Sequence, residues 1–116
     1  MSNSLQPTKH FVQVPMPNWM FDTAKALAKD KAMDFKALLE AFIDSYIESK
    51  KDYDHEKDRY VIFYASPANS KPRSIWLSQS HYKKVEAFAQ KHTSRINRVV
   101  FSACLDGLIA HHCVSI

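Results

Sequence analysis

The sequence predicts a mainly α-helical protein with short β-strands, in which two β-α-α repeats share one hydrophobic core. Three observations predict this class. A short alternating run and two stretches of helical apolar spacing occupy residues 11–50, and the same order recurs at residues 73–112. Nearly all apolar positions of the first copy stay apolar or small when 61 is added to their numbers, without a gap. Because a copy of ~40 residues buries too little surface to fold alone, the two copies are expected to fold together.

The first copy begins with a predicted strand at residues 11–16, where Val14 and Met16 occupy alternate positions. Pro17 marks a turn into a helix that Asn18 can cap and that runs to about residue 31. Asp34 is the expected cap of a second helix, which runs to about residue 49. The apolar stripe of that helix is wide enough to need partners on two sides, and it contains Phe35, Leu38, Leu39, Phe42, Ile43, Tyr46 and Ile47.

Residues 51–72 form the expected linker between the copies. Within it, residues 59–65 (RYVIFYA) are β-branched and aromatic, which indicates a possible extra strand. Residues 66–72 (SPANSKP) have the composition of a loop, which could close a hairpin onto the next strand.

The second copy repeats the pattern, with a strand at residues 73–77 and a helix at residues 79–91. Ser78 is the expected cap of this helix. Thr93 or Ser94 is the expected cap of the last helix, which runs to about residue 111.

Length and composition bound the class of protein. A chain of 116 residues with 46% hydrophobic residues fits one domain spanning residues 1–116. Its single glycine, Gly107, argues against a glycine-rich phosphate loop. No secretory signal and no apolar run of membrane-spanning length is visible, and Cys104 and Cys113 fit reduced thiols. We therefore expect a cytoplasmic protein without a membrane partner.

Charge is unevenly divided between the two halves. Residues 1–58 contain eight Lys against ten Asp and Glu, a net charge of −2, whereas residues 59–116 contain eight Lys and Arg against two acidic residues, a net charge of +6. A half-molecule of this charge favours a polyanion, with nucleic acid first and an acidic membrane or protein second. The alternative is a solvated surface whose charge only tunes solubility.

The second copy, RSIWLSQSHYKKVEAFAQKHTSRINRVVFSACLDGLI, resembles the ribbon-helix-helix DNA-binding family, and the first copy, FVQVPMPNWMFDTAKALAKDKAMDFKALLEAFIDSYI, is similar in spacing. The resemblance covers about 80 of the 116 residues. It implies a short antiparallel β-ribbon and one domain with pseudo-twofold symmetry. Two copies in one chain resemble the tandem form found among accessory proteins of bacterial conjugation, which bind transfer-origin DNA.

The resemblance also implies which residues contact DNA, because β-ribbon readers place outward side chains in the major groove. The expected base contacts are Gln13, Ser74 and Trp76. The family turns the start of its second helix toward the phosphate backbone. The expected phosphate contacts are Lys71, Arg73, Ser94, Arg95, Asn97 and Arg98. The corresponding turn of the first copy contains Asp34, so DNA contact is expected mainly through the second copy.

Some of these residues also have a purely structural interpretation. Trp76 could pack against residues 59–65, and Arg95 and Arg98 could be solvated residues at a helix start. Pro15 and Trp76 are unusual in a base-reading ribbon, and Pro15 lacks the N–H that a paired strand needs.

No catalytic site, metal site or cofactor is expected. Cys104 falls in an apolar stripe, and the adjacent His111 and His112 point to different sides of a helix. No nucleophile, base and orienting group can be assembled from the sequence, so a small-molecule substrate is not expected either.

The sequence therefore favours a double-stranded DNA-binding protein, acting as a bacterial transcriptional repressor or as a plasmid origin-of-transfer accessory factor. It could self-associate on adjacent DNA sites. The alternative is a protein-interaction module that keeps the fold and has lost base readout.

Overall fold

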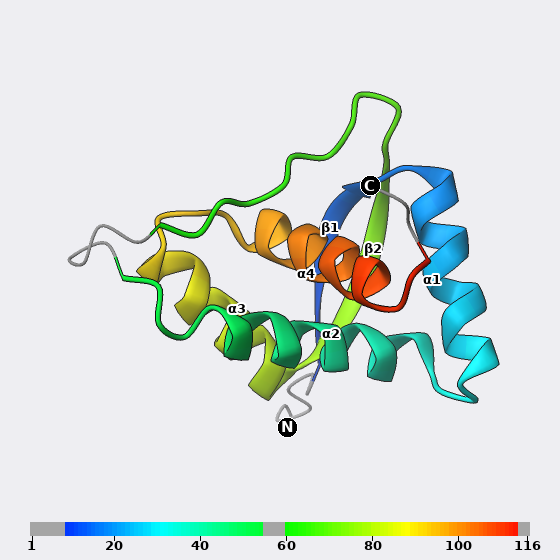
Figure 1. Cartoon of the computed structure of the whole chain (residues 1–116), viewed down its shortest axis with the longest axis horizontal. Coiled ribbons are helices and arrows are strands. Elements are labelled where there is room, and N and C mark those ends of the chain that lie inside the picture. The colour runs from blue at the N-terminus through cyan, green and yellow to red at the C-terminus, as the bar shows by residue number, and fades with distance from the viewer. Residues whose placement is uncertain (1–8, 55–59, 114–116) are drawn as a thin grey trace, which may run out of the picture.

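The chain forms helices around one two-stranded antiparallel sheet, so the expected class, mainly helical with a short antiparallel sheet, is confirmed (Figure 1). The structure is a computed structural model that describes residues 9–54 and 60–113. In these residues the elements are β1 Lys9–Met16, α1 Asn18–Asp30, α2 Phe35–Ser49, β2 Lys71–Ser78, α3 Gln79–Lys91 and α4 Ile96–Ala110.

The sheet is a ribbon in which β1 pairs with β2, and Gln13 lies directly opposite Ser74 at its centre. The side chains alternate between two faces, as the period of two requires. The buried residues of the inward face are Val12, Val14, Met16, Ile75 and Leu77. The alternation of Val14 with Met16 that the sequence predicted is thereby confirmed. Each strand is longer than expected, because β1 begins two residues earlier and β2 includes Lys71, Pro72 and Ser78.

The two prolines of the ribbon lie opposite one another, Pro15 on β1 and Pro72 on β2. In an antiparallel pair, every second position directs its N–H and C=O away from the partner strand. Two contacts show that the prolines occupy such positions. On β1, Ser66 Oγ donates to the carbonyl of Pro15 at 2.6 Å. On β2, the N–H of Ser78, an even number of positions from Pro72, points away from β1 and donates to Glu40 Oε2 at 2.7 Å. The ribbon therefore loses no ladder hydrogen bond to either proline.

The helix starts differ from the sequence expectation at two places. Ser78 caps α3 as expected, because its Oγ accepts the N–H of His81 at 3.3 Å. Asp34 stands at the cap position of α2 without a side-chain cap hydrogen bond. Asn18 was predicted to cap α1, but Pro17 stands at that position and Asn18 is the first helical residue.

The predicted cap of α4, Thr93 or Ser94, is also wrong, because Arg95 occupies that position. Thr93 instead ends α3 in a left-handed conformation with φ 52°, and Ser94 N–H donates back to Ala89 O at 2.8 Å. This hydrogen bond and the left-handed residue form a Schellman motif at the C-terminus of α3. Thr93 and Ser94 belong to that motif, so α4 begins after Arg95. Ala32, after α1, has the same conformation with φ 54°.

The helix bounds of the two halves are spaced by a constant interval. Both α3 and α4 begin and end 61 residues after α1 and α2, respectively. The left-handed residues Ala32 and Thr93 have the same spacing, as have the paired central residues Gln13 and Ser74.

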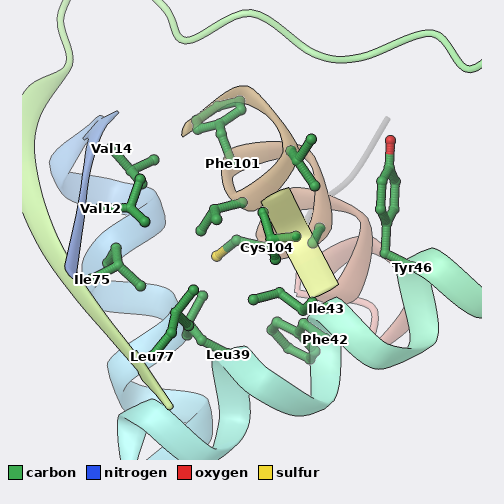
Figure 2. Close-up of a cluster of buried hydrophobic side chains, with 14 of the residues drawn as sticks. Val12, Val14, Leu39, Phe42, Ile43, Tyr46, Ile75, Leu77, Phe101 and Cys104 are labelled. Atoms are coloured by element: carbon green, nitrogen blue, oxygen red, sulfur yellow. The ribbon is translucent and has the colours of Figure 1, made fainter. Parts of the chain in front are cut away.

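One hydrophobic cluster collects side chains from both strands and all four helices. Figure 2 shows part of it, with Val14, Leu77, Leu39, Phe42 and Cys104 pointing toward one another from the ribbon, α2 and α4. Helices α2 and α4 make the central helix pair of this core.

Helices α2 and α4 are tightly packed at Gly107. A Cβ atom at Gly107 would lie 2.4 Å from the nearest ring atoms of Phe42. Residues of unequal size therefore face each other here, a large one on α2 and the smallest on α4. The residues equivalent to Phe42 and Gly107 at a spacing of 61 are Ala103 and Tyr46. In this equivalent pair, too, the large residue belongs to α2 and the small one to α4.

Residues 59–65 were predicted as a possible extra strand. Residue 59 lies outside the described residues, and residues 60–65 form no strand, so the prediction is wrong for the described part. Val61 is buried. The centre of the Phe63 ring lies 6.4 Å from that of Tyr46 and 6.2 Å from that of Phe88. The N–H of Tyr64 donates to Ser102 Oγ on α4 at 2.9 Å. The segment thus packs Val61 and Phe63 against the core and pairs with neither strand of the ribbon, so the hairpin with β2 that the sequence suggested is not formed.

A polar network joins α2 to α3. Asp44 accepts hydrogen bonds from Lys84 at 2.6 Å and contacts His81 Nε2 at 3.1 Å, and Glu40 lies 3.5 Å from His81 Nδ1. Partial burial raises the pKa of Glu40, but the hydrogen bonds from Ser78 and Lys36 and the influence of His81 outweigh it, so the pKa lies below 4.5. The same opposition, with Lys84 and His81 outweighing burial, holds the pKa of Asp44 below 3.8.

Candidate nucleic-acid interface

From Phe11 to Pro15, the outward face of the ribbon carries three cross-strand pairs of side chains. At one end the rings of Phe11 and Trp76 are 5.1 Å apart, and both residues are about half exposed, at 49% and 51%. In the middle, Gln13 Nε2 donates to Ser74 Oγ at 3.3 Å, and both are exposed. The prolines described above form the third pair. Residues at such positions have their side chains closest together, which explains both contacts.

The structure therefore brings together the three expected base-contact residues. Gln13, Ser74 and Trp76 lie on one exposed face, within two positions of one another along the ribbon. About half of the surface of Trp76 is exposed, and its ring contacts that of Phe11.

Arg73 lies apart from this face. Its position in the alternation directs it inward, where its guanidinium donates to Asn18 Oδ1 and lies 4.4 Å from the centre of the Phe21 ring. Its Nε also lies 3.5 Å from the carbonyl of Met16. These contacts join β2 to the start of α1. The phosphate contact expected of Arg73 stays a prediction. Lys71, at the start of β2, is exposed.

The remaining expected phosphate contacts gather where α4 begins. Arg95, Asn97 and Arg98 line a hollow of about 220 Å³ together with Pro15 and residues 64–66. A second, wider hollow of about 530 Å³ lies beside it and is lined by Ala89, Gln90, Thr93, Ser94, Arg95 and Arg98. The hollows place two arginines and a helix N-terminus next to the proline end of the ribbon.

The charges of these arginines are open to solvent. Arg95 and Arg98 are both exposed, and neither forms a salt bridge within residues 9–54 and 60–113. The first turn of α4 also has free backbone N–H groups, which favour an anion. This end of α4 can therefore attract a phosphate group.

The start of α2 has a different character. Asp34 is exposed at its cap position, and the Lys36 ammonium lies 3.3 Å from Glu40 Oε2. The lysine in the first turn of α2 is thus paired with a carboxylate, and the cap residue is itself acidic. The two helix starts are therefore electrostatically unequal, in the sense that the sequence suggested.

Sequence reasoning left out three contributors to this surface. Phe11 was assigned to the first strand but not to the contact residues, Pro72 was assigned to a loop, and residues 64–66 were assigned to a strand and a loop. The spacing of 61 between the repeats could have indicated the positions of Phe11 and Pro72. If strands 11–16 and 73–77 pair about Gln13 and Ser74, Phe11 falls opposite Trp76 and Pro15 falls opposite Pro72.

The thiols and other ligand groups add no further site. Cys104 is fully buried, and burial raises its pKa to about 12, whereas Cys113 is exposed. Over the described ranges, no three His, Cys, Asp or Glu side chains are grouped so that they could hold a metal ion. None of the helices in the described part of the chain has the length and apolar character needed to cross a membrane.

Comparisons of the chain with protein-family models, with curated proteins and with solved structures found no match.

Proposed function

We propose that the chain is a double-stranded DNA-binding protein of the ribbon-helix-helix type, with both repeats in one polypeptide. It would act in the bacterial cytoplasm as a transcriptional repressor or as an origin-of-transfer accessory factor. In this proposal the ribbon enters the major groove, which is wide enough for two β-strands.

Residue spacing supports the proposed tandem repeat. Four independent features recur at an interval of 61: the bounds of the first helix, the bounds of the second helix, the left-handed residue between them and the central ribbon residue. Antiparallel pairing of Gln13 with Ser74 is what a pseudo-twofold axis through the centre of the ribbon requires. The proposed domain thus spans residues 1–116, with repeats at 11–50 and 73–112 and a linker at 51–72.

The observation that carries the proposal is the hydrogen-bonded pair of Gln13 and Ser74 at the centre of an exposed ribbon. Gln can bind adenine through two hydrogen bonds, and Ser can donate to or accept from a base edge. Arg95 and Arg98 beside one end of the same ribbon supply charge for the phosphate backbone. Base-reading and phosphate-binding groups thus border one surface.

A titration of labelled random duplex DNA with the full chain tests the proposal. We expect submicromolar binding at low ionic strength that weakens steeply as salt is added, because each neutralised phosphate releases counterions. Absence of binding at roughly 50 mM salt, where phosphate contacts are strong, would refute the proposed function.

The phosphate-binding end can be tested with a matched pair of variants. Arg95→Ala with Arg98→Ala removes two charges at the start of α4 and should lower the slope of log K against log salt by about two. Lys29→Ala with Lys31→Ala removes two exposed charges near the corresponding turn of the first half and should change the slope much less. Equal losses in the two variants would show that net charge alone, and not the start of α4, governs binding.

A second candidate function is a protein-interaction module of the same fold. The exposed aromatic pair of Phe11 and Trp76 on the outward face of the ribbon favours it. The duplex titration distinguishes the two functions, because a protein-interaction module would show no salt-sensitive binding to DNA.

A further inference from the structure

We propose that Phe11 and Trp76 form an apolar contact site for the methyl groups of thymine, so that one end of the ribbon selects A·T base pairs. This inference rests on the proposed function and specifies the DNA that the ribbon would prefer. Neither residue was needed for the phosphate or hydrogen-bonding contacts above.

The position of the aromatic pair fits a role at the surface. Phe11 and Trp76 lie on the outward face, on the opposite side of the ribbon from the buried cluster, and each exposes about half of its surface. Their contact holds both rings in place, with ring centres 5.1 Å apart and planes inclined by 47°. The pair thus presents a fixed apolar surface whose loss would leave the core intact.

The spacing along the ribbon matches the spacing of bases. Side chains two positions apart on one strand are roughly 7 Å apart, which equals about two base-pair steps of 3.4 Å. When Gln13 and Ser74 face one base pair, Phe11 and Trp76 therefore face bases about two steps away. Both pairs can be read in a single placement of the ribbon.

The chemistry selects thymine among the groups exposed in the major groove. Every base pair presents hydrogen-bonding groups there, and the C5 methyl of thymine is the apolar one. Apart from the indole N–H of Trp76, the two rings themselves offer no hydrogen-bond donor, so the pair gains most from contact with that methyl. DNA is favoured as the partner over another protein because the other end of the ribbon adjoins the exposed charges of Arg95 and Arg98.

Removing the thymine methyl tests the inference directly. Two A·T-rich duplexes of identical sequence are compared, one with thymidine and one with deoxyuridine at every thymidine position, by fluorescence anisotropy at low salt. The parent chain should bind the thymidine duplex about three- to ten-fold more tightly, since burial of one methyl group supplies about four-fold. Phe11→Ser with Trp76→Ser should bind both duplexes equally, with its dependence on salt unchanged. Trp76→Phe should retain the discrimination because it keeps an apolar ring.

The outcomes separate this inference from the function on which it rests. Equal binding of both duplexes by the parent chain overturns the thymine contact and leaves DNA binding in place. Discrimination that persists in the double serine variant, with its fold verified by circular dichroism, also overturns the assignment. Failure to bind either duplex overturns the proposed function as well. Self-association of the parent in sedimentation, lost in the double serine variant, would then assign the pair to contact with a second copy.

Discussion

Addition of a single methyl group at Gly107 should destabilise the protein, because the ring of Phe42 occupies the space that the methyl needs. The new Cβ would lie 2.4 Å from two ring atoms and 2.6 Å from a third, where ordinary carbon contacts are about 3.5–4.0 Å. Phe42 is only 4% exposed, so its ring has little room to move. The two helices must therefore separate, or the ring must leave its preferred rotamer.

The expected magnitude combines two opposing effects. Overpacking a core costs about 1–3 kcal/mol, and three close ring contacts favour the upper end. Replacement of glycine by alanine inside a helix stabilises by about 1 kcal/mol. Gly107→Ala should therefore lower the free energy of unfolding by about 2 kcal/mol, which corresponds to a fall in Tm of roughly 7 °C for a chain of this size.

A double-mutant cycle tests the mechanism by urea denaturation. In a Phe42→Ala background the ring is gone, so Gly107→Ala should become neutral or stabilising by up to ~1 kcal/mol, giving a coupling energy of about 2–3 kcal/mol. Phe42→Ala alone costs about 3–5 kcal/mol, and Phe42→Leu provides a milder background if that variant does not fold. If Gly107→Ala has the same effect in every background, the close contact between α2 and α4 is not what makes glycine necessary.

Three further predictions concern the polar network, the helix closures and the thiols. Because the pKa of Glu40 is lower in the folded chain, its carboxylate stabilises the fold above its ordinary pKa of 4.5, and this stabilisation should disappear as the pH falls through the folded-state value. Urea midpoints measured across this range should depend less on pH in Glu40→Gln. Thr93→Gly should raise the free energy of unfolding by up to ~1 kcal/mol, because a β-branched residue is strained at φ 52° and glycine is not. With a thiol reagent at neutral pH, Cys113 should react in the native protein and Cys104 only after unfolding.

Each of these predictions has a control within the chain. Asp30→Asn removes an exposed carboxylate outside the α2–α3 network and should leave the dependence on acid unchanged. Ala87→Gly, at an exposed position inside α3, should destabilise by about 1 kcal/mol, whereas Thr93→Gly should have the opposite sign. Rapid reaction of both thiols in the folded chain would contradict the burial of Cys104.

The faces of the ribbon could be predicted from the sequence because they depend on a local rule. Val14 and Leu77 lie two positions from other apolar residues, and the period of a strand directs all of them to one side. The register could not be predicted in the same way. Which residue faces Gln13 depends on how two distant strands meet, and the sequence alone offers several pairings.

The errors arose where a local pattern has more than one three-dimensional solution. Residues 60–65 have the side chains of a strand, but Val61 and Phe63 pack against the core and Ser102 accepts the N–H of Tyr64. Thr93 has a side chain that suits a helix N-cap, but it adopts the left-handed conformation that ends α3. Each outcome was decided by a partner distant in sequence or by the end of the preceding helix.

The opposed prolines also limit how the sheet can grow. Both strands of a two-stranded sheet are edge strands, which could recruit a third strand through outward N–H and C=O groups. Pro15 and Pro72 offer no N–H at that border, Ser66 already occupies the carbonyl of Pro15, and Glu40 occupies the N–H of Ser78 at the opposite end. Strand addition and fibre growth are therefore disfavoured along both borders. The sheet keeps a width of two strands, which is the width that a major groove of about 12 Å admits in the proposed mode of binding.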